Sequence, residues 1–169
     1  APAFQFYENT VVVSSFAKDL SLPGERIGYI AVNPASDNPE EFISAVTFAL
    51  RVLGCVNAPA FFQKVIAKSW DAEVNYSSYK TRRDKLMAIL DKVGIEYYRP
   101  QGAFYLFCRV PENFKGDDGD FCDYLKKFLI LTAPGSGFGG KGWFRLAYCV
   151  SEKTIVNSEK AFAEAMKSI

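Results

Sequence analysis

The stretch SFAKDLSLPGERIG, residues 15–28, places Lys18 three residues after a serine and follows it with a Pro-Gly turn and an arginine. A lysine reacts as a nucleophile only as a free amine, so a reactive lysine needs a lowered pKa and a fixed position. The β-branched residues that precede this stretch, 10–13, predict a buried strand that would hold Lys18 rigidly. The Pro23-Gly24 turn would bend the chain so that Arg26 faces back toward Lys18.

The whole pattern resembles the lysine signature of the class I and II aminotransferases, which are pyridoxal-phosphate (PLP) enzymes of fold type I. The resemblance implies that Lys18 holds PLP as a Schiff base and moves a proton between the substrate α-carbon and the cofactor. It also implies that Ser15 and Arg26 bind the PLP phosphate, for which a hydroxyl donor and a forked guanidinium are suited. Taken singly, Lys18 and Arg26 would be interpreted as solvated surface charges.

A second motif, PGSGFG at residues 134–139, is followed by the strand-like run WFRLA at 143–147. It resembles the family's P-G-x-x-F-G and F-R-L/I element, whose arginine binds the substrate α-carboxylate, here Arg145. An arginine among aromatic and apolar residues is costly to bury unless it meets an anion. Pairing with a carboxylate would orient the α-carbon bond that is broken. The alternative interpretation is a structural ion pair between Arg145 and an internal Asp or Glu.

The resemblance implies an α/β fold, the C-terminal portion of the PLP-dependent transferase fold. Residues 1–72 are expected to be the incomplete end of the large PLP-binding domain. Residues 73–169 are expected to form the small C-terminal domain, entered through a long linking helix that ends at Gly94. Family members are more than twice this length and carry their lysine past the middle, whereas Lys18 lies near the start of this chain. We therefore expect the chain to be the C-terminal part of a longer aminotransferase.

Periodicity and capping signals predict the remaining elements. Helices are expected from Asn38-Pro39 to Gly54, from about Pro59, over 73–93, around 121–128 and after Ser151. Strands are expected near 10–13, 27–32, 95–98, 103–110, 130–131 and 143–148. The run 100–107, which overlaps the start of the fourth, resembles the family's P-x-G-A-F-Y-x-F stretch. Residues 115–120 are predicted to be a polar loop, and residues 82–85 a solvated helix face.

Composition excludes several classes of function. The chain has 169 residues, 49% of them hydrophobic, and a formal net charge of +1, which favours neither nucleic acid nor a membrane surface as a partner. No apolar run is long enough to cross a bilayer. Histidine is absent, which excludes histidine triads and histidine metal sites from this chain. The four cysteines lack CxxC spacing, and we expect reduced thiols in a cytoplasmic protein, with Cys108 and Cys149 buried.

The expected function is that of a PLP-dependent aminotransferase that moves an amino group between an α-amino acid and a 2-oxo acid. The resemblance implies a homodimer whose active sites lie at the subunit interface. It also implies that an aspartate, a ring-stacking aromatic residue and a phosphate-binding helix come from outside this chain. We therefore expect the chain alone to be inactive.

Three alternatives share the same motifs: a PLP-dependent C–S lyase of the same fold, the aminotransferase-like sensor half of a transcription regulator, and a catalytically dead interaction domain. Retention of the lysine with both arginines argues against the last. The identity of the substrate stays open. In the resembling aspartate aminotransferases a second arginine, ahead of the element that corresponds to Asn57-Ala58-Pro59, binds the side-chain carboxylate. The nearest candidate here, Arg51, lies about one residue out of register. Asn57 would otherwise only cap a helix.

Residues 1–72 have strands that belong to a larger sheet. Without that sheet, residues 11–13 and 27–32 are expected to pair as an antiparallel hairpin or to dock with another copy through an open edge. We expect this half of the chain to be oligomeric or rearranged and empty of PLP, and residues 73–169 to fold as an intact layer.

Overall fold

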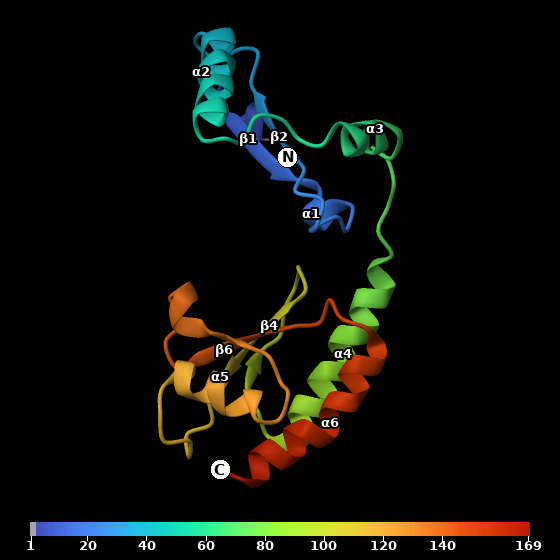
Figure 1. Cartoon of the computed structure of the whole chain (residues 1–169), viewed down its shortest axis with the longest axis vertical. Helices are drawn as coiled ribbons and strands as arrows, with labels where there is room; N and C mark the ends of the chain where they lie inside the picture. Colours follow the sequence, from blue (N-terminus) through green and yellow to red (C-terminus); the bar gives the residue numbers. More distant parts are fainter. Residues whose placement is uncertain (1–2) are drawn as a thin grey trace. The chain divides into compact units, whose positions relative to one another are not determined.

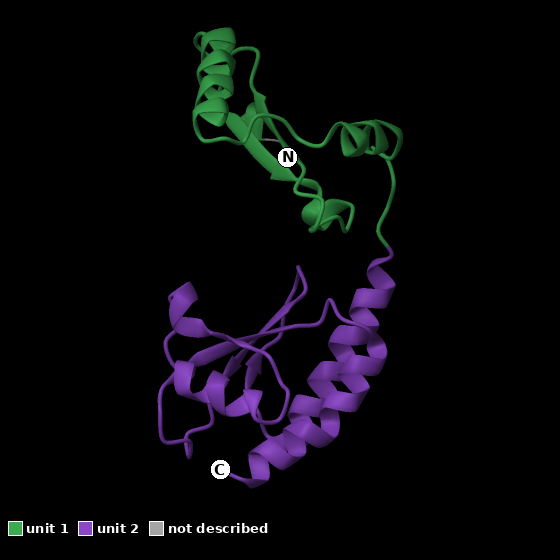
Figure 2. Ribbon diagram, in the orientation of Figure 1, with its two compact units in different colours: residues 1–74 green, residues 75–169 purple. Residues whose placement is uncertain are grey.

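The computed structural model describes residues 3–169, which divide into two compact units between Val74 and Asn75 (Figures 1 and 2). This boundary between the units lies two residues beyond the predicted domain boundary between residues 72 and 73. Asn75 is also the residue that caps the long helix of the second unit, since its side-chain oxygen accepts a hydrogen bond from the Ser78 N–H at 3.4 Å. The boundary therefore falls where a short irregular segment gives way to this helix.

The first unit contains a two-stranded antiparallel sheet flanked by helices. Its elements are η1 (Ala3–Gln5), β1 (Val11–Ser15), α1 (Phe16–Asp19), β2 (Gly28–Val32), α2 (Pro39–Val52) and α3 (Ala60–Lys68). The predicted antiparallel pairing is confirmed, with Val11 opposite Val32 and Ser15 opposite Gly28. Glycine is needed in β2 at this point, because a Cβ on Gly28 would lie 2.4 Å from the carbonyl oxygen of Ser14.

The strand before the lysine turn is not buried as predicted. Val13 is 74% exposed, and α2 exposes apolar residues such as Phe48 and Val52. Between β1, β2 and α2 lies an apolar groove of about 450 Å³. The physical reason is that a two-stranded sheet gives each strand only one neighbour and leaves its faces without a second layer. A small core nevertheless forms at the other end of the hairpin from Phe16, Ile27 and Ile66.

The second unit contains a four-stranded antiparallel sheet in the order β3-β4-β6-β5. Its elements are α4 (Tyr76–Val93), β3 (Tyr97–Tyr98), β4 (Tyr105–Arg109), α5 (Asp118–Lys126), β5 (Ala133–Pro134), η2 (Gly135–Phe138), β6 (Trp143–Ala147) and α6 (Glu152–Lys167). Helices α4 and α6 lie side by side (Figure 1), and α5 packs on β5 and β6. As predicted, Ser151 caps α6, accepting a hydrogen bond from the Thr154 N–H at 3.1 Å.

Successive side chains along β4 and β6 point to opposite faces of this sheet. Leu106, Cys108, Phe144 and Leu146 are buried and share the core with the three helices. Phe107 pairs with Arg145, so these two residues lie on the opposite face, which is only half-buried. The core packing thus leaves one sheet face, rich in aromatic residues, free to carry a site.

Three local predictions for the second unit are wrong. Residues 130–131 are not a strand, because Leu129 takes a left-handed backbone conformation with φ 61° and the sheet pairing begins only at Ala133. Residues 118–120, predicted as loop, already belong to α5, since Asp117 and Asp120 form a reciprocal capping box. Cys149, expected to be buried, is exposed, whereas Cys108 is buried as predicted.

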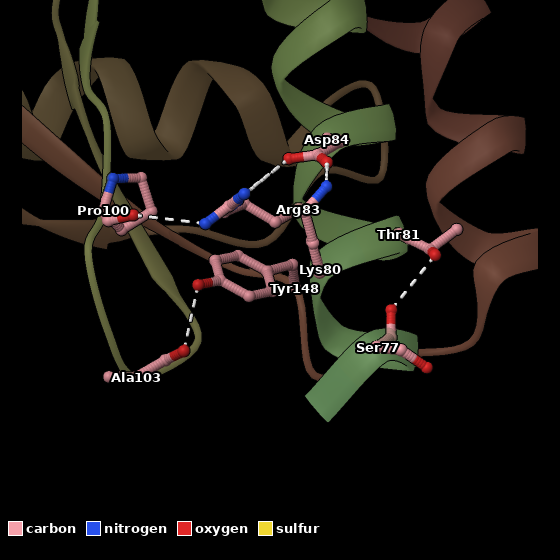
Figure 3. A network of polar contacts seen from close by, with 8 residues as sticks. All are labelled: Ser77, Lys80, Thr81, Arg83, Asp84, Pro100, Ala103 and Tyr148. Atoms are coloured by element: carbon pink, nitrogen blue, oxygen red, sulfur yellow. Dashed lines mark hydrogen bonds and ion pairs between the residues drawn. The ribbon is translucent and has the colours of Figure 1, made fainter. Parts of the chain in front are cut away.

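The predicted solvated face of α4 is also wrong at Arg83, whose side chain is only 19% exposed. Its guanidinium donates two hydrogen bonds to Asp84 Oδ1, at 2.8 and 2.9 Å, and reaches the Pro100 carbonyl oxygen at 3.5 Å (Figure 3). Nearby, the Tyr148 hydroxyl donates to the Ala103 carbonyl oxygen at 2.9 Å, and burial raises the pKa of Tyr148. These bonds tie α4 and the end of β6 to the loop between β3 and β4.

Candidate active site

Lys18 lies in α1, a single helical turn that follows β1 without a break. Ser15 is the N-cap of this turn, and its Oγ accepts a hydrogen bond from the Ala17 N–H at 3.1 Å. A capped turn at the end of a paired strand has few alternative conformations. The predicted strand directly before Lys18 is therefore present, although it is not buried and Lys18 itself is helical and exposed.

One carbonyl group joins the lysine turn to the arginine segment. The Ile27 carbonyl oxygen accepts hydrogen bonds from the Phe16 N–H at 3.1 Å and from Ser15 Oγ at 3.5 Å. Phe16 and Ile27 are also buried against each other. Ser15, Lys18 and Arg26, the residue before Ile27, are thereby brought to one end of the hairpin.

Arg26 is exposed and takes a left-handed backbone conformation, with φ 51°. For a residue with a Cβ this conformation costs about 1–2 kcal/mol, and such strain concentrates at functional positions. Its Nη1 donates to the Pro23 carbonyl oxygen at 2.8 Å, so the side chain folds back over the Pro-Gly turn. An arginine has five N–H donors, and this bond uses one of them.

Arg145 lies at the centre of β6, in the second unit, and its guanidinium packs against two aromatic rings. Its Cζ is 4.3 Å from the centre of the Tyr105 ring and 4.2 Å from that of Phe138. Such cation–π contacts hold the faces of a guanidinium, while the N–H donors lie at its edges. Tyr98 and Trp143 continue the same aromatic face, with ring centres 4.6 Å apart.

The alternative interpretation of Arg145 as a structural ion-pair residue finds no support in the part of the chain that the structure describes. Ion pairs there involve other arginines and lysines, and no Asp or Glu of residues 3–169 lies within ion-pair distance of Arg145. A half-buried cation with aromatic neighbours and no carboxylate partner is suited to bind an external anion.

The glycine-rich motif forms η2 and the turn that follows it. Gly135 is buried, and a Cβ there would lie 2.3 Å from the Gly140 carbonyl oxygen, so only glycine fits. Gly139 ends η2 with φ 76°, in the left-handed conformation that favours glycine. This compact turn carries Phe138 to the guanidinium of Arg145.

Asp118 is a site-associated residue that sequence reasoning missed. It is only 2% exposed at the start of α5, and its Oδ2 accepts from the Ser136 N–H at 2.8 Å while its Oδ1 accepts from the Gly142 N–H at 3.2 Å. Hydrogen bonding from Ser136, with a smaller contribution from the Gly142 N–H, lowers the pKa of the Asp118 carboxyl against the opposing effect of its burial. In the sequence, three acidic residues within 117–120 gave no signal that the middle one is buried.

Replacing Asp118 with asparagine is expected to destabilise the second unit by about 1.5–3 kcal/mol near pH 6, because charge-assisted hydrogen bonds are lost. Since the folded pKa of Asp118 is lowered, its contribution is present above the unfolded value of about 3.9 and is lost as pH falls through the folded value. The difference between wild type and variant should therefore shrink below about pH 4. Urea unfolding followed by Trp143 fluorescence in a Trp70→Phe background measures it, and a pH-independent difference would contradict the assignment.

Within residues 3–169, no group of three His, Cys, Asp or Glu side chains is placed to hold a metal ion. Among the same residues, no helix is long and apolar enough to cross a membrane. Arg51 lies exposed in the last turn of α2, and the N-cap position of α3 is Pro59 rather than Asn57.

The sequence pattern of the family described as "Aminotransferase class I and II" matches residues 2–160, and the chain belongs to this family. Members of the family depend on PLP. The chain is 29% identical to an aspartate aminotransferase of Thermotoga maritima over 154 residues, covering 90% of this chain and 38% of that protein. It is 30% identical to a probable aspartate/prephenate aminotransferase of Aquifex aeolicus over 172 residues, covering 95% of this chain and 42% of that protein.

Among solved structures, an amino transferase from Eubacterium rectale matches 98% of this chain and 41% of its own length, with 39% identity and a TM-score of 0.81. An aspartate aminotransferase variant from Thermus thermophilus matches 98% of this chain with 26% identity and a TM-score of 0.72. The α/β fold is therefore that of the aminotransferases, and the chain spans about two fifths of the length of the relatives it matches.

Proposed function

We propose that this chain is the C-terminal part of a PLP-dependent aminotransferase that moves an amino group between an α-amino acid and a 2-oxo acid. The observation that carries the proposal is the pair of hydrogen bonds from Ser15 Oγ and the Phe16 N–H to the Ile27 carbonyl, which holds the turn of Lys18 beside the segment of Arg26, in a chain that belongs to this family. In this proposal residues 1–72 end the large domain and residues 73–169 form the small domain.

The donors at the end of the hairpin fit PLP, which has an aldehyde and a phosphate. Lys18 supplies an amine at a defined position, and Ser15 and Arg26 supply a hydroxyl and a guanidinium for the phosphate. The strained backbone of Arg26 supports a binding role rather than that of an incidental surface charge. When bound, PLP supplies the electron withdrawal that weakens a bond at the substrate α-carbon.

In this proposal Lys18 accepts the α-proton of the substrate and returns a proton during amino transfer. Arg145 binds the substrate α-carboxylate through its guanidinium edge, while Tyr105 and Phe138 keep the guanidinium plane in place. A substrate anchored by its carboxylate presents a defined α-carbon bond for cleavage.

The amino-acid substrate is to be identified by assay. Relatives carry names such as aspartate aminotransferase and aromatic-amino-acid aminotransferase, and both classes of amino acid are candidates here. Family membership also supports a homodimer as the working assembly.

The test is an amino-transfer assay of the full-length protein that contains this chain, with PLP, a panel of amino acids and 2-oxoglutarate. The expected result is a new amino acid and a new 2-oxo acid in equal amounts. Release of pyruvate from cystathionine without amino transfer would instead identify a C–S lyase.

A further inference from the structure

Asp118 accepts a hydrogen bond from each side of the turn that contains Phe138. One carboxylate oxygen accepts from Ser136 at the start of η2, and the other accepts from Gly142 just before β6. Asp118 is itself placed by α5, whose Phe121 packs on Phe144 of β6 with ring centres 5.0 Å apart. The carboxylate therefore connects the core of the second unit to the turn.

The side chain of Phe138 is not held by the core of the second unit. Its side chain is 53% exposed, so burial in the core does not fix its position. The turn around it contains Gly137, Gly139 and Gly140, and glycine-rich backbone has many accessible conformations unless hydrogen bonds restrict it. The two bonds to Asp118, on either side of Phe138, tie the turn to α5, in addition to bonds within the turn such as that from the Gly140 N–H to the Gly135 carbonyl oxygen at 2.9 Å.

The position of Phe138 in turn affects Arg145. The centre of its ring lies 4.2 Å from the guanidinium carbon, and that of Tyr105 lies 4.3 Å from it. A guanidinium in contact with two rings loses less freedom when it binds a carboxylate than one that rotates freely.

We propose that Asp118 is a positioning residue for carboxylate binding: it fixes the turn 136–142, which holds Phe138 against Arg145 and so preorganises the guanidinium for the substrate carboxylate. The proposal rests on the proposed function of Arg145. The proposal also predicts the direction in which the affinity for an anion changes. Removing a negative charge near an anion site should by electrostatics alone strengthen anion binding, whereas losing the preorganisation should weaken it.

The experiment uses the 169-residue chain with isotope-labelled arginine, observed by NMR. The first readout is the upfield ring-current shift of the Arg145 side-chain protons, for which Phe138→Leu is the reference for a lost ring. The second is the dissociation constant of pyruvate, titrated against sodium chloride at equal ionic strength, with Arg145→Ala as the blank. Asp118→Asn is compared with Asp120→Asn, which removes a charge from the same helix end, at a side chain that accepts from the Asp117 N–H rather than from the turn 136–142.

Asp118→Asn is expected to lose most of the upfield shift and to weaken pyruvate binding about threefold to tenfold. Asp120→Asn should change neither readout. If Asp118→Asn does not fold, Asp118→Glu keeps the charge, displaces the carboxylate by one methylene and should show the same two changes.

Unchanged shifts in the Asp118 variants, or altered shifts with pyruvate binding as tight as in wild type, would overturn the proposal. If wild type and Arg145→Ala respond to pyruvate alike, the carboxylate role of Arg145 fails and the inference fails with it. The shifts would then still show whether Asp118 places Phe138, so the two failures are distinguishable.

Discussion

Lys18→Ala in the full-length protein is expected to lower the rate of amino transfer by at least about 10³-fold, because the variant lacks the amine proposed to react with PLP and to move the α-proton. PLP should still bind non-covalently, since Ser15 and Arg26 remain to hold its phosphate. Steady-state kinetics measures the rate, and equilibrium dialysis measures PLP retention.

The matched control is Lys64→Ala, which removes an exposed lysine from α3 of the same unit. It should leave both the rate and PLP retention unchanged. A Lys18→Ala enzyme with near-normal turnover would show that another residue is the reactive amine.

Replacing Arg145 and replacing Arg26 are expected to impair different steps, substrate binding and PLP binding. Arg145→Ala should lower kcat/KM for amino acids by roughly 30-fold to 150-fold, mostly through KM, as a lost charge-assisted pair at a half-buried site costs about 2–3 kcal/mol. It should leave PLP binding intact. Arg26→Ala should instead weaken PLP retention, because the phosphate loses a guanidinium.

A control for Arg145 lies on the neighbouring strand. Arg109 of β4 is exposed and pairs with Glu96 and Glu112, so Arg109→Ala should leave kcat/KM nearly unchanged. Equal losses of PLP affinity in Arg26→Ala and Arg145→Ala would contradict the division of roles.

The sequence was sufficient to predict structural features that depend on a short local pattern. The strand before Lys18 is one of them, and it pairs with the strand that follows Arg26. Gly94 and Ser151 likewise end and begin helices through local backbone bonds, and both were predicted.

Features that depend on tertiary packing could not be predicted. The burial of Asp118 results from two N–H groups 18 and 24 residues away along the chain, and its neighbours Asp117 and Asp120 form an exposed cap instead. Arg83 was assigned to a solvated face because the carbonyl it approaches, that of Pro100, lies in a distant loop.

The exposure of β1 has a different cause. Val11 and Val13 are β-branched residues that favour a buried strand. Residue type does not determine whether this chain contains a second layer that covers the strand. Relatives of which this chain spans about two fifths contain further sequence that could supply such a layer.

Borohydride reduction of the full-length protein in the presence of PLP, followed by mass spectrometry of its peptides, identifies the lysine that reacts with the cofactor. We expect one PLP per chain, attached to Lys18, and no label above background on Lys64 or Lys68 of the same unit. Attachment of PLP to a different lysine, with Lys18 unmodified, would contradict the assignment of residues 15–28 as the cofactor-binding turn.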